Sequence, residues 1–156
     1  MKPDGRSVMN ETKGNGSVQG GEAFVWPARV YYEDTDAGGV VFHARYVHFL
    51  ERARTEWLRS LGFEQSNLTL REKVVFAVSK LALDFRRPAY LDDLLSVGVE
   101  LAGTGRASLM MRQAITRGEE AILTAEVKLV CVDSERFRPT SIPEPITRAF
   151  APSSRA

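Results

Sequence analysis

Apolar and polar side chains alternate along four stretches in the second half of the chain, and this period of two is typical of half-buried β-strands. Short turn-like links join the four stretches, which favours antiparallel neighbours. A fifth strand is predicted near the start of the chain from aromatic and β-branched residues, with Pro27 favouring an edge position or a bulge. The five predicted strands cover residues 24–32, 80–86, 95–101, 108–116 and 123–131.

Residues 44–61 follow a different period, with apolar side chains three and four positions apart, as expected for one long amphipathic helix. Gly62 is well placed to end this helix. The residues before it offer no Ser, Thr, Asp or Asn as a cap, so its first backbone N–H groups are open to another partner. The apolar stripe consists of Val47, Leu50, Ala53, Trp57, Leu58 and Leu61.

One helix that must bury its stripe against one antiparallel sheet predicts the α+β class, with the sheet wrapped around the helix. Such a sheet leaves an edge strand for a second copy, so we expect a homodimer or a homotetramer. Residues 1–22 are rich in glycine and poor in large apolar side chains, which predicts a disordered tail. The folded domain is expected over residues 23–135. Prolines should end regular structure near Asp133 and leave a Pro-rich tail at residues 136–156.

Charge and cysteine content narrow the function classes. The chain has 21 basic and 20 acidic residues, a net charge of +1, which argues against nucleic acid as the main partner. No apolar run approaches the length of a membrane span. One cysteine, Cys131, and 2 histidines argue against a metal centre. Because no apolar signal core is present, we expect a cytoplasmic protein.

The candidate chemistry lies in residues 32–46, where a carboxylate, a glycine turn, a histidine and a helix start follow one another. A helix N-terminus presents donor N–H groups that suit a carbonyl oxygen becoming negative during attack. A nearby carboxylate such as Asp36 could activate water or attack the carbonyl itself. Hydrolysis of an ester-like bond is therefore one possible chemistry, and an Asx turn is the alternative role for Asp36.

The segment from Arg29 to Gly62 resembles the hotdog-fold acyl-CoA thioesterases of the 4-hydroxybenzoyl-CoA thioesterase family, in particular its YbgC-like, Tol-Pal-associated branch. The match to the pattern D-x-x-G-x-x-x-[HY]-x-x-Y is carried by Asp36, Gly39, His43 and Tyr46. The resemblance implies a hotdog fold, with a five-stranded antiparallel sheet around one central helix. It also implies hydrolysis of an acyl-CoA to a free acid and the CoA thiol.

The resemblance further implies roles for single residues. Asp36 matches the catalytic aspartate, as general base or nucleophile. The backbone N–H of His43 would polarise the thioester carbonyl, and its side chain would position water or substrate. Tyr32 matches a tyrosine beside the aspartate. Gly39 would let the backbone turn beside the thioester, and Tyr46 lies near the substrate or packs beside it.

Coenzyme A enters as part of the substrate, and no separate cofactor is implied. Its phosphates call for basic and hydroxyl side chains, for which Arg87, Arg106 and Ser108 are the candidates. In hotdog enzymes the CoA groove lies across the dimer interface, so the catalytic aspartate and the pantetheine arm can involve different subunits.

Several alternatives stay open. Glu51 on the helix could act as the catalytic carboxylate, as a helix glutamate does in another hotdog branch. Acyl carrier protein adducts could replace acyl-CoA as the substrate. Two further hypotheses are a hotdog dehydratase and a hotdog module that binds acyl chains or envelope partners with little catalysis. The sequence leaves the acyl chain length undecided.

Overall fold

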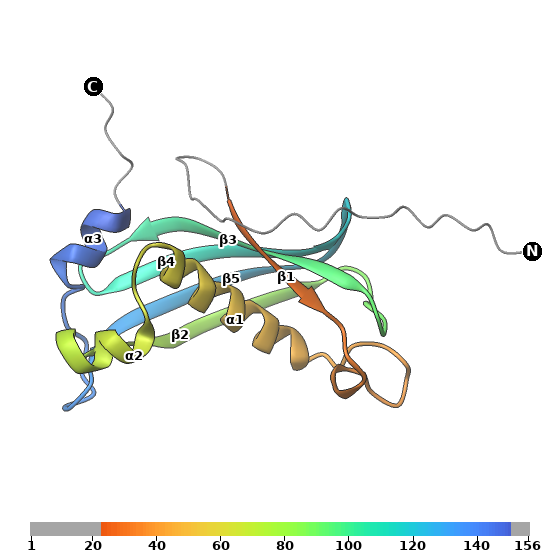
Figure 1. Ribbon diagram of the computed structural model, residues 1–156, viewed down its shortest axis with the longest axis horizontal. Coiled ribbons are helices and arrows are strands. Elements are labelled where there is room, and N and C mark those ends of the chain that lie inside the picture. The colour runs from red at the N-terminus through yellow and green to blue at the C-terminus, as the bar shows by residue number, and fades with distance from the viewer. Residues whose placement is uncertain (1–22, 151–156) are drawn as a thin grey trace, which may run out of the picture.

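The computed structural model describes residues 23–150, so the predicted tail at residues 1–22 lies outside the described part. Five antiparallel strands form one sheet in the order β1-β3-β4-β5-β2. As Figure 1 shows, the long helix lies across one face of this sheet. The strands are β1 (Phe24–Arg29), β2 (Val74–Phe85), β3 (Leu94–Thr104), β4 (Ser108–Arg117) and β5 (Glu120–Asp133).

The alternating pattern correctly predicts which side chains of the central strands face the helix. Val97 in β3, Met111 in β4 and Val127 in β5 are fully or almost fully buried, whereas their polar neighbours face outward. Strand β2 begins at Val74, earlier than the predicted start at residue 80. The alternating pattern does not reveal residues 74–79 as part of this strand, because a register shift between Val78 and Lys80 interrupts the alternation. The inward positions of β2 therefore change from even to odd numbers.

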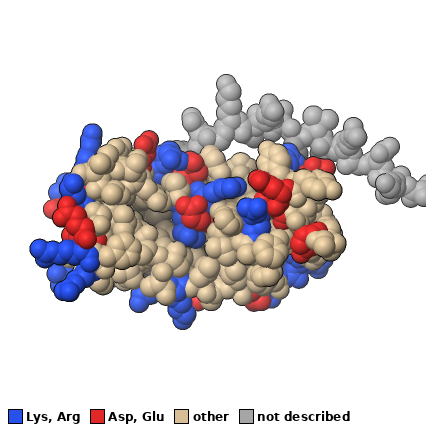
Figure 2. All heavy atoms as spheres, turned by 90° about the horizontal axis from the view of Figure 1, so that it is seen from below, with Lys and Arg blue, Asp and Glu red and all other residues tan. Residues whose placement is uncertain are grey.

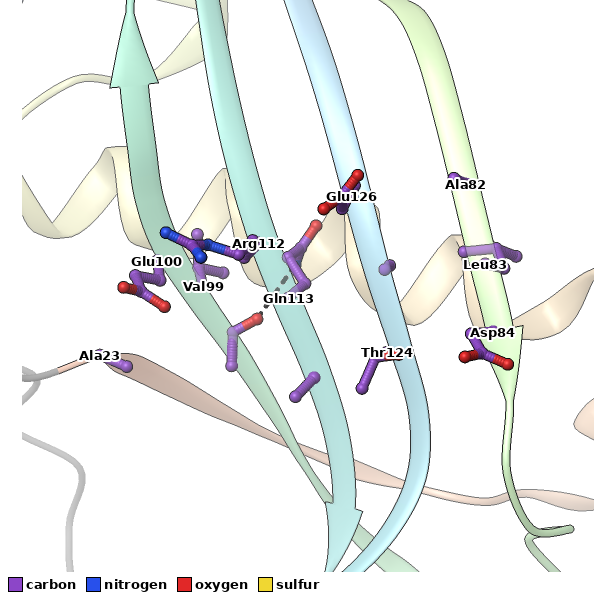
Figure 3. Close-up of a pocket in the computed structure, with 13 residues that line it drawn as sticks. Ala23, Ala82, Leu83, Asp84, Val99, Glu100, Arg112, Gln113, Thr124 and Glu126 are labelled. Carbon is purple, nitrogen blue, oxygen red and sulfur yellow. Dashed lines mark hydrogen bonds between the residues drawn. The ribbon is translucent and has the colours of Figure 1, made fainter.

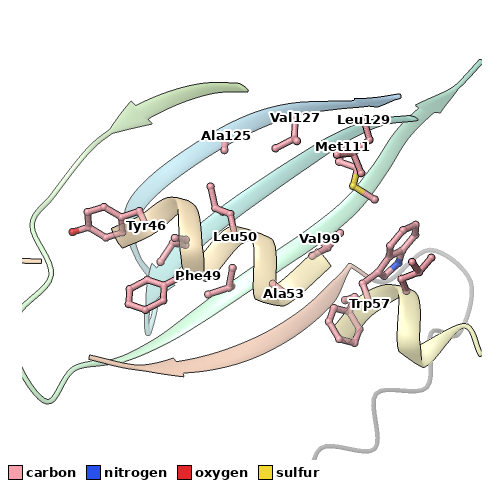
Figure 4. Close-up of a cluster of buried hydrophobic side chains, with 14 of the residues drawn as sticks. Tyr46, Phe49, Leu50, Ala53, Trp57, Val99, Met111, Ala125, Val127 and Leu129 are labelled. Atoms are coloured by element: carbon pink, nitrogen blue, oxygen red, sulfur yellow. The ribbon is translucent and has the colours of Figure 1, made fainter. Parts of the chain in front are cut away.

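The predicted helix is confirmed as α1 (Arg45–Ser60). Leu50, Ala53, Trp57 and Leu58 of its predicted stripe are buried, and Leu61 packs against this core. Val47 lies outside the core, whereas Tyr46 and Phe49 belong to it. Figure 4 shows Tyr46, Leu50 and Trp57 spread along the buried side of α1 beneath the strands. The chain leaves the helix at Gly62, whose φ of 97° suits a residue without a Cβ. The short elements α2 (Gln65–Asn67) and η2 (Leu68–Glu72) then lead into β2.

The C-terminal part differs from the expected Pro-rich tail. Residues Glu144–Phe150 form a helix, α3, that packs against the end of the sheet (Figure 1). Ile146 is fully buried, and the ring of Phe150 stacks on Trp57 with centroids 5.3 Å apart. Pro145 is tolerated because it lies in the first turn of α3, where a backbone N–H has no partner within the helix.

The sheet has two outer strands, β1 and β2. Pro27 lies in β1, which confirms its predicted edge position. Strand β2 exposes two large apolar side chains, Val78 at 49% and Phe85 at 50%. Within residues 23–150, no helix has both the length and the apolar character that crossing a membrane requires.

Candidate active site

The loop between β1 and α1 is fastened to the helix by Asp34, a buried carboxylate with 3% exposure. Its Oδ2 accepts a hydrogen bond from the backbone N–H of Tyr31 at 2.8 Å, and its Oδ1 lies 3.1 Å from Nε of Arg45. The Arg45 guanidinium also donates to the backbone oxygen of Glu33. The short helix η1 (Tyr32–Asp34) therefore has a fixed position relative to the start of α1.

Asp36 follows η1 at the start of a tight turn. Its Oδ1 accepts a hydrogen bond from the backbone N–H of Gly38 at 2.8 Å, which is the Asx geometry named above as the alternative role. Gly39 adopts a φ of 79°, and its N–H donates to the backbone oxygen of Asp36. The carboxylate itself is exposed, so it combines a fixed turn with access to solvent.

The start of α1 has the open N-terminus that the sequence indicates. No side chain caps Ala44, and the N–H of Arg45 turns back to the carbonyl of Phe42 at 2.8 Å. Within the described residues, the backbone N–H of His43 has no acceptor. A free donor at the positive end of a helix can stabilise negative charge that develops on a carbonyl oxygen.

A shallow cleft of about 280 Å³ lies beside this helix start and brings together His43, Tyr46 and Arg87 with Phe85. The hydroxyl of Tyr46 accepts a hydrogen bond from the backbone N–H of Ala89 at 3.2 Å. Burial raises the pKa of Tyr46, although the hydrogen bond from Ala89 and the positive charge of Arg117 act in the opposite direction. Arg87 is exposed at the cleft and pairs with Glu120 at 3.0 Å.

Five predicted site residues do not line this cleft in a single chain: Asp36 and Gly39 lie in the preceding turn, and Tyr32, Arg106 and Ser108 lie elsewhere. Tyr32 points into solvent with 82% exposure, although it is close to Asp36 in sequence. Arg106 and Ser108 are at the turn between β3 and β4, whereas Arg117 at the far end of β4 contacts Pro88 beside the cleft. The ten residues of β4 span nine residue-to-residue steps, so these two ends lie roughly 30 Å apart. Within a single chain, Arg106 instead donates to the hydroxyl of Ser141 at 2.8 Å.

The structure adds a residue that the sequence analysis missed. Arg117 lies between the carboxylates of Asp93 and Glu120, and these hydrogen bonds raise its pKa. Its guanidinium also lies over the ring of Tyr90, 5.7 Å from the centroid. Through its contacts with Pro88 and Asp93, Arg117 connects the end of β4 to the loop of residues 88–93, which begins at the cleft. In the sequence, the only sign of this role is the group of charged residues on either side of Gly118, at the predicted turn after this strand.

A separate hollow with a volume of about 480 Å³ lies on the outer face of the sheet. Figure 3 shows Arg112 between Glu100 and Glu126 on neighbouring strands of this face. This hollow contains none of the predicted site residues. Within residues 23–150, no group of three or more His, Cys, Asp or Glu side chains is placed to hold a metal ion.

Comparison with known proteins places this architecture in a family. The family model of the thioesterase-like superfamily matches residues 30–150. The acyl-CoA thioesterase YbgC of Haemophilus influenzae is 46% identical over 127 residues, which cover 81% of this chain and 93% of that protein. The acyl-CoA thioester hydrolase YbgC of Escherichia coli O157:H7 is 48% identical over 128 residues, covering 81% of this chain and 95% of that protein.

A solved structure of a related protein has the same fold. The crystal structure of a probable thioesterase from Bartonella henselae matches with a TM-score of 0.76 and 38% identity, covering 78% of this chain and all (100%) of that one. The match to the family model extends to residue 150 and so includes α3, which lies beyond the domain boundary expected at residue 135. The chain belongs to the thioesterase-like superfamily, and its sheet around α1 is the hotdog fold that the sequence resemblance implied.

Proposed function

We propose that this protein is an acyl-CoA thioesterase that hydrolyses the thioester to a free acid and the coenzyme A thiol. The observation that carries this proposal is the 46% identity to a named acyl-CoA thioesterase over 93% of that protein. The geometry supports it, because an exposed carboxylate on a fixed turn precedes a helix start with an open N–H group. Acyl carrier protein thioesters contain the same kind of bond and are the second substrate class to compare.

Asp36 supplies the carboxylate, as general base or as nucleophile. As a base, it takes a proton from water while the water oxygen attacks the carbonyl carbon. The carbonyl oxygen becomes negative and is stabilised by the backbone N–H of His43. The C–S bond then breaks, and the sulfur leaves as a thiolate that takes up a proton. A thiol with a pKa of about 8.5 needs little help from a general acid.

We also propose that the working form contains two copies joined along β2. The inward side chains of β2 are Val74, Phe76 and Val78 before the register shift, and Leu81, Leu83 and Phe85 after it. Side chains directly opposite each other in an antiparallel pair share a face. Full-length pairing sets Val74 opposite Phe85 and Val78 opposite Leu81, so inward residues meet inward residues. Such pairing would cover the exposed apolar side chains of this edge.

Two-fold pairing along β2 also bears on the binding of coenzyme A. It reverses the strand direction, so the turn with Arg106 and Ser108 of one copy lies at the same end as the cleft of the other. Ser108 pairs with Val130 of β5, which neighbours β2, so three strand spacings of roughly 14 Å separate it from the β2 of the other copy. Arg87 at the cleft and these two residues would then hold the phosphates together. The substrate class and the unpaired Cys131 fit a cytoplasmic place of action.

The activity is tested by thiol release from short, long and aromatic acyl-CoAs, with Asp36→Asn beside the unmodified chain. Glu33→Gln is the matched control, because Glu33 is an exposed carboxylate of the same loop. We expect turnover to be lost in Asp36→Asn and kept in the control. Turnover that survives in Asp36→Asn would move the chemistry to another carboxylate, with Glu51 first. An unmodified chain that cleaves neither acyl-CoA nor acyl carrier protein thioesters would contradict the proposed function.

The dimer is tested by light scattering coupled to gel filtration. Val78→Lys introduces a charge into the proposed interface and should yield a monomer. Val25→Lys is the control, since Val25 is exposed to a similar degree, 54%, on the opposite edge strand. If the unmodified chain elutes as a monomer, pairing along β2 is ruled out.

A further inference from the structure

A second cavity lies between α1 and the sheet, away from the helix start that holds His43. Its volume is about 110 Å³, and its lining is mostly apolar, with Trp57, Phe76 and Met111 among the contributing residues. Figure 2 views the molecule from the side of α1 and β2 and shows a hollowed surface with acidic and basic side chains around it. At about 30 Å³ for each water-sized group, the cavity has room for roughly four such groups.

The unusual member of this lining is Arg54, which comes from the buried stripe of α1 and is 8% exposed. Its Nη1 donates to Oε1 of Gln113 at 3.0 Å, and Gln113 in turn donates to the backbone oxygen of Leu50 at 3.1 Å. These bonds fix one side of the guanidinium. An arginine has five N–H donors, so the hydrogen bond to Gln113 leaves most of the donors of Arg54 available to other acceptors.

Arg54 is one of the residues that line the cavity, and its hydrogen bond to Gln113 uses Nη1. Within residues 23–150, every fully buried side-chain nitrogen or oxygen has a hydrogen-bond partner. The nitrogens of Arg54 that make no hydrogen bond are therefore not fully buried and retain some accessible surface. Arg54 lines the cavity, which provides that surface. Burial lowers the pKa of Arg54, and the opposing influence is the charge of Glu51 at the same cavity. Glu51 itself accepts a hydrogen bond from Thr55.

We infer that this cavity receives the far end of the acyl group and that Arg54 selects acyl chains that end in a carboxylate. A cation held in an apolar cavity is costly until an anion pairs with it, and a carboxylate matches the guanidinium fork. An alkyl end would leave the open N–H donors of Arg54 without an acceptor, although Glu51 at the same cavity offsets part of its charge. The inference rests on the proposed function and on pairing along β2.

The pairing along β2 places this cavity next to a cleft. Phe76 and Val78 line the cavity, and Phe85 lines the cleft of His43. In the full-length register, Phe85 of one copy lies opposite Val74 of the other, two residues from Phe76. An acyl chain whose thioester lies at the helix start of one copy therefore extends toward the cavity of the other.

The test compares isosteric substrates that differ at the far end. Malonyl-CoA is paired with 3-methylbutanoyl-CoA, and adipyl-CoA with 6-methylheptanoyl-CoA, so that a carboxylate replaces an isopropyl group. The measured quantity is the ratio of kcat/KM within a pair. We expect the unmodified chain to favour the carboxylate about tenfold or more in at least one pair. We expect Arg54→Met to reverse the preference while the isopropyl substrate is still hydrolysed.

Arg59→Met is the matched control, because Arg59 is an exposed arginine on the same helix, paired with Glu56. Should Arg54→Met fail to fold, Arg54→Lys keeps the charge but loses the fork, and should lower the carboxylate preference severalfold. Equal kcat/KM for both members of every pair, or a ratio that no Arg54 variant moves, would overturn the inference. Absence of hydrolysis of all acyl-CoAs would instead count against the proposed function.

Discussion

The contact between Asp34 and Arg45 makes a prediction about both stability and catalysis. Asp34→Ala removes the acceptor of the Tyr31 N–H and the partner of the Arg45 guanidinium. Each hydrogen bond to a charged group contributes about 1.5–3 kcal/mol, and the ion pair is discounted because the Arg45 side chain is 25% exposed. We expect a loss of about 3 kcal/mol for Asp34→Ala. Asp34→Asn keeps an acceptor for Tyr31 and should cost about 1.5 kcal/mol.

Urea unfolding of Asp34→Ala, Arg45→Met and the double variant measures the coupling between the two side chains. We expect the double variant to lose at least about 1 kcal/mol less than the sum of the single variants. Thiol release should show a lower kcat with a smaller change in KM, because Asp34 positions the turn that holds Asp36. Glu33→Gln serves as the exposed control. Additive losses, or an unchanged kcat in Asp34→Ala, would refute this account of the loop.

Three further measurements test the core. Ile146→Ala should lose about 3 kcal/mol in urea unfolding, whereas the exposed Thr147→Ala should change by less than about 0.5 kcal/mol; equal effects would contradict the docking of α3. Burial raises the pKa of Cys131 to about 11, so its stabilising contribution is complete below the unfolded pKa of about 8.5 and is lost as pH rises toward 11. Unfolding at pH 8 and pH 10.5 should show this loss relative to Cys131→Ala, and parallel pH profiles would argue against it. Tyr46→Phe deprives the buried N–H of Ala89 of its acceptor and should cost about 1–2 kcal/mol, which a chain of unchanged stability would disprove.

Periodicity predicted the helix and the central strands because each has one buried face and one exposed face. Prediction was weaker where that condition fails. The start of β2 at Val74 was missed because the shift near Val78 moves the inward positions to the other parity. The helix α3 lies in a stretch where the prolines predict an irregular tail, but Pro145 is in the first turn of α3, where a proline costs no hydrogen bond.

The residues of the candidate site and the second cavity fall into two groups, those that a local sequence motif can reveal and those that only the folded chain brings together. A local motif is enough to predict Asp36, Gly39 and His43 as candidates, because they follow one another in one loop and its helix start, and the turn of Asp36 and Gly39 has the expected geometry. The Arg54–Gln113 contact joins two elements 59 positions apart, so no local motif shows it. A signal existed nevertheless, because Gln113 occupies an inward position between Met111 and Ile115 in β4. A polar side chain at such a position needs a buried partner.

The separation of Arg106 and Ser108 from the cleft is itself an argument about how the site is assembled. Charge and motif assign these residues to coenzyme A, yet in one chain they occupy the opposite end of a ten-residue strand from the cleft. A rearrangement within the chain cannot close this distance, because Ser108 is paired in the sheet between β3 and β5. Either these residues have no part in substrate binding, or a second copy in reversed orientation brings them to the cleft. Thiol-release assays of Arg106→Ala separate the two cases. A raised KM for acyl-CoA that disappears in the monomeric Val78→Lys background would favour assembly across two copies, whereas an unchanged KM in the dimer would remove Arg106 from the site.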